Sequence, residues 1–257
     1  MKIKDEVLQV LSAAKVSGNE LYLQGQLDRP MYLAVNKVLE ASGGLWNRKS
    51  KCHIFDKDAE ERIDEIILTG EIDVPKDDFN YFPTPPDVVA KLLKLANITE
   101  GMNILEPSAG QGAIALACAE IGCIVDCYEL MEANIKVLLE HNVMRGGKLR
   151  RTLKQDFLTV ESILNKHDEL KYHRIVANPP FAKQADIKHV THAHKFLKPD
   201  GLLVSVMSAG VLFRSDRRTT EFRDFVESKG GEFEKLPEGS FKASGTMVST
   251  CIVSIPA

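Results

Sequence analysis

Residues 103–117 read NILEPSAGQGAIALA, an apolar run, a turn with two glycines and a second apolar run. NILEP has the length and composition of a buried strand, and AIALACAEIG, residues 113–122, is typical of a buried helix. Gly110 and Gly112 stand in the turn between them, where a tight strand-to-helix connection allows a ligand to approach the backbone. The spacing matches neither GxGxxG nor GxxxxGK[ST], so an ordinary turn remains an alternative for this stretch taken alone.

The same alternation of strand and helix continues to the end of the chain. We expect helices over residues 88–98, 113–122, 132–144, 186–197 and 221–230, and strands over residues 103–107, 123–130, 150–156, 174–179, 201–208, 232–237 and 246–255. This pattern predicts an α/β fold, a doubly wound and mostly parallel sheet with helices on both faces. Ligands of such sheets bind at the carboxyl ends of the strands.

A smaller α/β unit precedes this sheet. Helices are expected over residues 4–14, 30–42 and 58–70, and strands over residues 20–25 and 51–55. Pro30 begins the second helix and Gly70 closes the third. Residues 71–87, EIDVPKDDFNYFPTPPD, are rich in Pro and Asp and have no period, which is typical of a domain boundary. We therefore expect a small N-terminal domain over residues 1–75, with nucleic-acid binding as one role for it, and a main domain over residues 76–257.

Composition limits the class of protein. The chain has 257 residues, of which 44% are hydrophobic, enough for one large domain with a small appendage. It has no apolar stretch of about 18 residues and its N-terminus has no apolar signal region, so we expect a cytoplasmic protein without a membrane partner. The formal net charge of −3 excludes a uniformly basic surface. A local basic groove can still bind a nucleic-acid backbone.

Cysteine and histidine patterns do not indicate a metal site. The five cysteines are odd in number and three lie in apolar segments, as expected for reduced thiols of the core. Cys118, Cys123 and Cys127 match no CxxC pair. His189 and His192 share a helix face, but no further ligand follows them. We therefore expect no bound metal.

Acidic residues end the next two strands. Glu129 follows the glycines by about 20 positions, where a carboxylate can accept both hydroxyls of a ribose. Asp156 and Phe157 end the third strand. A carboxylate followed by an aromatic ring suits an adenine, with the acid accepting from the amino group and the ring offering a stacking face. These strand ends together predict a nucleoside site.

A fourth strand ends in the sequence IVANPPFAKQ, residues 175–184. Proline fixes φ and lacks an N–H donor, so Pro179 and Pro180 stop sheet pairing and leave carbonyl oxygens aimed outward. The side-chain oxygen of Asn178 and the carbonyl of Pro179 can then accept the two hydrogens of a planar amine. We expect Phe181 to stack on the target base, although it could instead fill the core after the strand.

These residues resemble the class I S-adenosylmethionine-dependent methyltransferases, and NPPF resembles the catalytic motif of members that methylate planar exocyclic amines. The likeness covers about residues 81–257. EPSAGQGAIA, the upstream FPTPPDVVAKLL and the downstream SGTMVST are most similar to N6-adenine DNA methyltransferases of the bacterial and phage kind. The resemblance implies a Rossmann-like methyltransferase sheet, S-adenosylmethionine as cofactor and DNA as partner.

The resemblance also implies roles for particular residues. The methionine part of the cofactor would contact Glu106, Ser108, Gly110 and Gly112, with Thr84 and Pro85 closing over it. The ribose would be held by Glu129, and the adenine by Asp156 and Phe157. The catalytic residues would be Asn178, Pro179, Pro180 and Phe181. Attack by the amine is then a direct in-line transfer without a covalent enzyme intermediate.

Two basic clusters are candidates for contacts with nucleic acid. The first surrounds the single tryptophan and comprises Trp46, Arg48, Lys49 and Lys51. The second comprises Arg214, Arg217 and Arg218. Basic groups beside an aromatic ring suit a phosphate backbone and a base. In the alternative interpretation, Trp46 packs between a helix and a strand, and the second cluster is a charged helix start.

The expected function is methyl transfer to the N6 amine of adenine in DNA, as in restriction–modification systems. The chain ends soon after the last predicted strands, so we expect low sequence specificity or a short recognition sequence. Three alternatives remain. They are an RNA base-amine methyltransferase acting on adenine N6 or guanine N2, a protein-glutamine N5 methyltransferase, and a catalytically silent nucleic-acid-binding protein. The last is disfavoured by Asn178 and the intact glycine turn. The sequence does not predict the oligomeric state.

Overall fold

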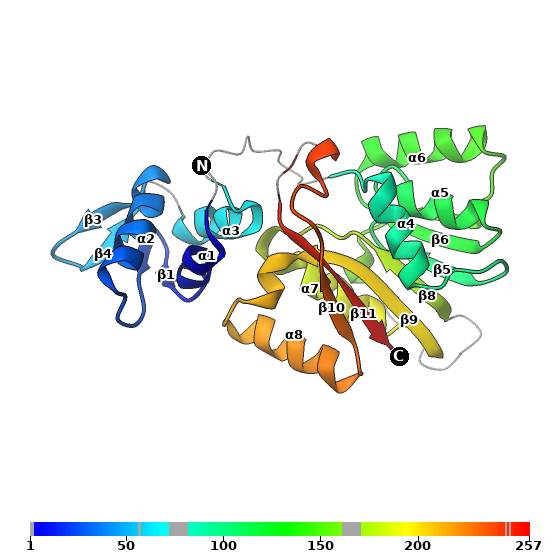
Figure 1. Ribbon diagram of the computed structural model, residues 1–257. Coiled ribbons are helices and arrows are strands. Elements are labelled where there is room, and N and C mark those ends of the chain that lie inside the picture. The colour runs from blue at the N-terminus through cyan, green and yellow to red at the C-terminus, as the bar shows by residue number, and fades with distance from the viewer. Residues whose placement is uncertain (1–2, 56–57, 72–81, 161–170, 245, 247) are drawn as a thin grey trace.

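The computed structural model describes residues 3–55, 58–71, 82–160, 171–244, 246 and 248–257. These residues form a small four-stranded sheet and a large seven-stranded sheet, each with its own helices (Figure 1). The expected boundary between residues 75 and 76 lies outside the described residues. Within the described part of the chain, every helix is too short or too polar to cross a membrane.

The large sheet has the predicted doubly wound architecture. Its strands are β5 (Asn103–Glu106), β6 (Ile124–Glu129), β7 (Arg151–Lys154), β8 (Tyr172–Ala177), β9 (Leu197–Ser208), β10 (Glu232–Lys235) and β11 (Thr250–Pro256). Their order is β10-β11-β9-β8-β5-β6-β7. The two pairs that include β11, with β10 and with β9, are antiparallel, and the other four pairs are parallel. From β5 the chain winds first toward β7, then returns to β8 and winds the other way. That reversal opens a crevice at the carboxyl ends of β5 and β8.

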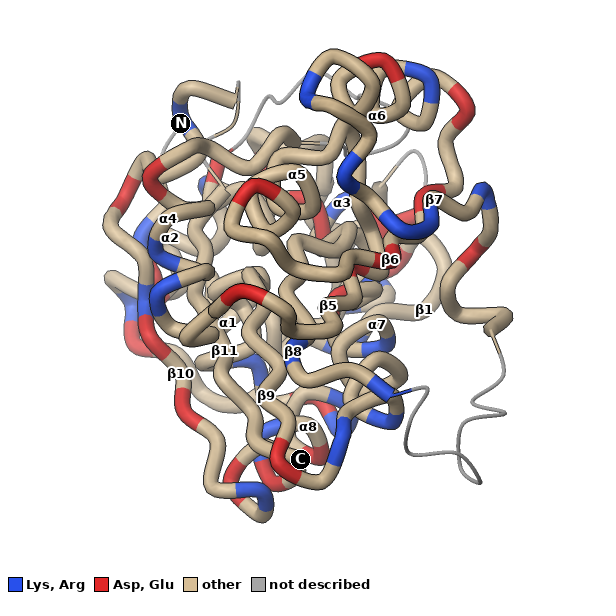
Figure 2. The backbone as a smooth tube through the Cα atoms, turned by 90° about the vertical axis from the view of Figure 1, so that its right-hand side faces the viewer, with Lys and Arg blue, Asp and Glu red and all other residues tan. Residues whose placement is uncertain are grey.

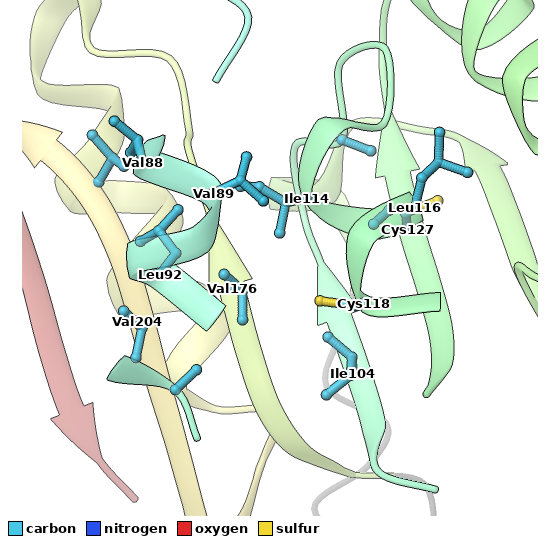
Figure 3. Close-up of a cluster of buried hydrophobic side chains, with 14 of the residues drawn as sticks. Val88, Val89, Leu92, Ile104, Ile114, Leu116, Cys118, Cys127, Val176 and Val204 are labelled. Atoms are coloured by element: carbon cyan, nitrogen blue, oxygen red, sulfur yellow. The ribbon is translucent and has the colours of Figure 1, made fainter. Parts of the chain in front are cut away.

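Helices cover both faces of this sheet, as predicted. One face carries α4 (Pro86–Leu95), α5 (Ala113–Glu120) and α6 (Glu132–Met144), and the other carries α7 (Ala185–His194) and α8 (Arg217–Ser228). Successive strand residues point to opposite faces, so Ile104 belongs to the first core and Leu105 to the second. Figure 3 shows Leu92 of α4 close to Val176 and Val204 of the strands.

The N-terminal unit contains two strands more than the sequence predicts. Its elements are α1 (Asp5–Ser12), β1 (Lys15–Ser17), β2 (Glu20–Tyr22), α2 (Arg29–Ala41), β3 (Leu45–Asn47), β4 (Cys52–Ile54) and α3 (Ala59–Thr69). The sheet is antiparallel in the order β1-β2-β4-β3. All four strands have three residues, but β2 and β4 lie within the longer strand-like runs 20–25 and 51–55, whereas β1 and β3 stand in short stretches between glycine and polar residues. Gly70 ends α3 at φ +68°, as predicted.

Short 3-10 helices connect the large elements. They span Phe157–Thr159 (η1), Ala182–Gln184 (η4), Ala209–Leu212 (η5) and Lys242–Ser244 (η6). The N-terminal helix α3 contacts both η4 and η5. The small unit therefore packs against the segment that follows the NPPF turn. All five cysteines are buried free thiols.

Candidate active site

A cavity of about 260 Å³ lies at the carboxyl ends of β5, β6, β7 and β8. Residues expected from the sequence that line it are Ser108, Glu129, Asp156, Phe157, Asn178, Pro179, Pro180 and Phe181. Further lining residues include Phe82, Pro107, Leu130, Met131, Asn134, Gln155, Leu158 and His189. The fold thus brings together residues that lie far apart in the sequence, because the parallel strands end at one edge of the sheet. The lining does not include five further residues that the resemblance assigns to the cofactor, which are Thr84, Pro85, Glu106, Gly110 and Gly112.

The two glycines of the turn after β5 serve different purposes. Gly110 has φ +53°, and its N–H donates to Glu129 Oε2 at 2.7 Å. Gly112 has φ +90°, and a Cβ there would collide with Leu138 of α6 and lie 3.0 Å from Leu116 Cδ1. Gly112 is therefore required by the packing of α5 against α6, whereas Gly110 faces a carboxylate.

Glu129 ties the glycine turn to the end of β6. Its Oε1 accepts from Met131 N at 2.7 Å, its Oε2 accepts from Gly110 N, and the residue is 9% exposed. Each carboxylate oxygen keeps a further lone pair, so the side chain can still accept hydroxyl groups from a ligand in the cavity.

Glu106 is a buried carboxyl group at the end of β5. It is 2% exposed, and within the described part of the chain its Oε2 has no hydrogen-bond partner. Burial raises the pKa of Glu106 well above its usual value, the backbone N–H of Ala115 opposes this shift, and the charge of Glu129 adds to it. An unpaired buried acceptor costs about 1–3 kcal/mol, so a donor that reached this atom would be bound favourably.

Asp156 and Phe157 occupy the end of β7, as expected, but the ring is mostly part of the core. Asp156 Oδ1 accepts from Leu158 N at 2.9 Å and begins η1. Phe157 is 2% exposed and packs against Tyr128, His192 and Phe196 with ring centroids 5.1–5.2 Å apart. The ring therefore offers only a small part of its surface to the cavity. Leu158 beside it is 36% exposed and also lines the cavity.

The side-chain amide of Asn178 is oriented by the segment before α4. Its Nδ2 donates to the Phe82 carbonyl at 3.3 Å and to Thr84 Oγ1 at 3.0 Å. A carbonyl can only accept, so the nitrogen of the amide must face Phe82. The opposite atom, Oδ1, is buried and finds no donor among the residues described. The amide is therefore oriented through its nitrogen, and its oxygen is an acceptor left unpaired within the described part of the chain.

The turn continues into strained backbone. Phe181 is 7% exposed and belongs to the core that includes α4 and α5, although part of it lines the cavity. Lys183 and Gln184 follow with φ of +53° and +56°. This left-handed conformation costs about 1–3 kcal/mol for each residue that is not a glycine. Gln184 Nε2 donates to Asp216 Oδ2 at 3.0 Å, which fixes the turn to the start of α8.

Sequence reasoning missed His189 as a residue of this cavity. Its Nδ1 lies 3.4 Å from Ser108 Oγ, and burial lowers the pKa of His189 to about 4. The ring is therefore neutral near neutral pH. His192 contacts the Val160 carbonyl and His194 the Pro256 carbonyl, so the three histidines do not converge. Among the described residues, no group of three or more His, Cys, Asp and Glu could hold a metal ion.

The two basic clusters lie outside the cavity. Arg214 has a role that the sequence did not predict, because its guanidinium contacts Asp64 of α3 at 2.8 Å and Asp216 at 3.2 Å. Arg217 is 90% exposed and pairs with Glu221 at 2.6 Å, while Arg218 is exposed beside it. Phosphate contacts by these arginines stay a prediction. The cluster around Trp46 belongs to the four-stranded sheet, away from β5 and β6 (Figure 1).

Comparisons with known proteins agree with this architecture. The type I restriction–modification methyltransferase subunit from Streptococcus thermophilus is 16% identical with a TM-score of 0.61, covering 76% of this chain and 48% of that one. A putative class I S-adenosylmethionine-dependent methyltransferase from Listeria monocytogenes is 15% identical with a TM-score of 0.56, covering 98% of this chain and 78% of that one. TrmN from Thermus thermophilus is 21% identical with a TM-score of 0.50, covering 66% of this chain and 48% of that one.

At these identities the likeness concerns the fold alone, and the chain spans about half the length of TrmN and of the restriction–modification subunit. No curated protein matches the sequence. Residues 86–223, more than half of the chain, match the methyltransferase small domain. This chain therefore belongs to the methyltransferase small domain family, and its cofactor is S-adenosylmethionine.

Proposed function

We propose that this protein transfers a methyl group from S-adenosylmethionine to the exocyclic N6 amine of adenine in DNA. The observation that carries the proposal is the buried Oδ1 of Asn178, which no described residue supplies with a donor. This oxygen belongs to the NPPF turn, whose residues line the cavity beside Glu129 and Asp156. In this proposal the amine acceptor and the nucleoside site share one cavity.

The residues of the site fit the cofactor. Glu129 would hold the ribose and Asp156 the adenine, while the turn of Ser108 and Gly110 would contact the methionine part. The unpaired Glu106 Oε2 is an acceptor suited to an ammonium group. When bound, the cofactor supplies an electrophilic methyl group on a positively charged sulfur.

The chain's own contribution is to orient the amine. The adenine amino group is a weak nucleophile because its lone pair is delocalised into the ring. Asn178 Oδ1 and the Pro179 carbonyl would accept its two hydrogens and so hold the lone pair in one direction. The stiff Pro179–Pro180 segment keeps the two acceptors at a fixed separation. No covalent bond to the enzyme is needed.

DNA is the favoured acceptor because the segments EPSAGQGAIA, FPTPPDVVAKLL and SGTMVST resemble those of N6-adenine DNA methyltransferases. A second candidate is an RNA base amine. The fold is also similar to a putative RNA methyltransferase from Pyrococcus horikoshii, at 21% identity and a TM-score of 0.52 over 71% of this chain and 89% of that one. DNA and RNA bases both present a planar exocyclic amine, whose two hydrogens Asn178 Oδ1 and the Pro179 carbonyl would accept in the same way.

Incubation with tritiated S-adenosylmethionine and separate DNA, RNA and protein acceptors tests the proposal. We expect label in DNA, recovered as N6-methyladenine after digestion to nucleosides. Label in RNA alone would select the second candidate, and label in protein alone would contradict both. Measurable cofactor binding without label in any acceptor would instead indicate a catalytically silent binding protein. Long-read sequencing of DNA from an expressing host would then locate the methylated adenines.

A further inference from the structure

The N-terminal sheet carries a separate surface that the methyl-transfer chemistry does not use. We name it the β3 surface and define it by Trp46, Arg48, Lys49 and Lys51. Trp46 is the only tryptophan of the chain and is 43% exposed. It lies on β3, which ends the order β1-β2-β4-β3 and pairs only with β4 among the strands described. The ring is therefore partly exposed, on the edge strand of this sheet.

A buried histidine holds the indole in place. Trp46 pairs with His53 across the two strands, and their ring centroids are 5.1 Å apart at an angle of 59°. His53 has no exposed surface, and its Nε2 lies 2.8 Å from Asn36 Oδ1 of α2. Asn36 Nδ2 donates to Glu40, so Asn36 Oδ1 is the acceptor and His53 Nε2 the donor. The indole therefore rests on a fixed ring, and little conformational freedom remains to be lost when a ligand stacks on it.

The turn after β3 directs three positive charges outward. Asn47 Oδ1 accepts from Lys49 N at 2.9 Å and from Ser50 N at 3.2 Å, which closes the turn. Lys51 completes it with φ +53°. Arg48, Lys49 and Lys51 are exposed, and none of them forms an ion pair with a carboxylate in the described part of the chain.

The three charges lie within four consecutive positions, in a stretch, residues 41–55, that contains no acidic residue. The chain as a whole has a formal net charge of −3, and Figure 2 shows basic and acidic residues interspersed on the side of the large sheet. Several exposed basic side chains elsewhere pair with acids, as Lys91 does with Glu234 and Arg217 with Glu221.

We propose that the β3 surface is a second nucleic-acid-binding site, at which Trp46 stacks on an unpaired base and the three basic side chains contact the flanking phosphates. An exposed, rigid aromatic ring binds the flat face of any base, and adjacent cations bind the backbone by releasing its counterions. A phosphate backbone complements all three charges at once. The site is independent of the methyl acceptor, because β3 lies far from β5 and β6 in the fold (Figure 1).

The single tryptophan makes a direct test practical. The full-length protein is titrated with a single-stranded oligo(dT) of about 20 nucleotides, a length that exceeds the site size of typical single-strand binders. We expect quenching of Trp46 fluorescence and an affinity that falls as salt rises. Oligo(dT) offers no adenine amine, so it cannot be methylated during the titration, and the variants described below locate where it binds.

Charge-neutralised variants locate the binding. In the triple variant Arg48→Gln, Lys49→Gln, Lys51→Gln we expect the dissociation constant to rise at least tenfold. The negative slope of the logarithm of the association constant against the logarithm of the salt concentration should become shallower by about 2, since each phosphate contact on a single strand contributes about 0.7. The matched control neutralises Lys94, Lys195 and Lys229, which are exposed near the C-terminal ends of α4, α7 and α8. This control should bind like the unaltered protein.

The indole is tested separately. Trp46→Phe keeps a ring on His53 and should retain most of the affinity for oligo(dT), whereas Trp46→Ala should lower this affinity at least fivefold. Far-ultraviolet circular dichroism checks that both variants are folded.

Unchanged affinity and salt slope in the triple variant would overturn the proposal. Tight binding of polyglutamate with no response to oligo(dT) would also overturn it, in favour of an acidic protein partner. Failure of methyl transfer to DNA, with these binding results intact, would reject only the proposed reaction.

Discussion

Asn178 Nδ2 donates a hydrogen bond to Thr84 Oγ1 at 3.0 Å, so a residue just before α4 orients the amide that follows β8. Thr84 is 9% exposed and lies 94 residues earlier in the chain. With the Phe82 carbonyl, it occupies the donor side of the amide, and Oδ1 is left without a donor among the described residues. On this geometry Thr84 is a positioning residue for the proposed acceptor.

Thr84→Val removes the hydroxyl and nearly preserves the shape of the side chain. We expect kcat on DNA to fall about tenfold, equivalent to about 1.4 kcal/mol and within the range for one hydrogen bond. The KM for the cofactor should change less than threefold. Thr84→Ser keeps the hydroxyl and should recover most of kcat. A rise in cofactor KM with unchanged kcat would instead support the expectation that Thr84 closes over the methionine part.

Asn178→Ala should abolish methyl transfer while the cofactor affinity, measured by calorimetry, stays within a few-fold of normal. The physical reason is that the proposed role of Oδ1 is to accept a hydrogen from the amine, and no cofactor contact is assigned to it. Lys188→Ala, an exposed substitution on α7, serves as a control for nonspecific damage. Near-normal turnover of the Asn178→Ala variant would reject the acceptor assignment.

Gly112→Ala should destabilise the protein more than Gly101→Ala. Both glycines have positive φ, +90° and +80°, so both substitutions carry a backbone penalty of about 1–2 kcal/mol. Only at Gly112 does a new Cβ also meet Leu138 and Leu116, which adds about 1–3 kcal/mol of overpacking. Urea denaturation of the two variants measures the difference. Equal losses of stability would show that the packing of α5 against α6 relaxes freely.

Asp64→Ala should weaken the attachment of α3 to the large sheet. The Asp64–Arg214 contact of 2.8 Å is largely shielded, with side-chain exposures of 17% and 16%. Removal of Asp64 leaves the shielded Arg214 with only the longer contact to Asp216 at 3.2 Å among the described carboxylates, and we expect a loss of about 1–3 kcal/mol in unfolding experiments. The exposed pair Arg217–Glu221 is the control, and Glu221→Ala should cost less than about 1 kcal/mol. If the two variants lose the same stability, the contact does not hold the units together.

Protonation of His189 should make the protein less stable in mild acid. Its pKa is lowered from 6.5 to about 4, mainly by burial, so the unfolded chain binds the proton more readily than the folded one. The stabilisation is complete above about pH 6.5 and is lost as the pH falls toward 4. His189→Gln should therefore reduce the difference in unfolding free energy between pH 5 and pH 8. An unchanged difference would assign the acid sensitivity to other groups.

The alternation of apolar runs and turns was sufficient to predict most elements and the doubly wound sheet, because the period of a strand or helix is a local property. The strand ends carrying Gly110, Glu129, Asp156 and Asn178 were predicted to meet for the same reason, since parallel strands finish at one edge. Strands β1 and β3 of the N-terminal unit escaped prediction because no longer strand-like run surrounds them, as one does for the equally short β2 and β4.

Contacts between distant residues could not be read in this way. The sequence did not show that Phe157 would be enclosed by three other rings, and it left open whether Phe181 stacks on a base or joins the core, as it does beside α4 and α5. Nor did it pair Arg214 with Asp64, 150 residues away, or place Thr84 against Asn178. Periodicity reports which side of an element is apolar. Which side chains meet depends on how the finished elements pack against one another, and that packing is settled only when the whole chain has folded.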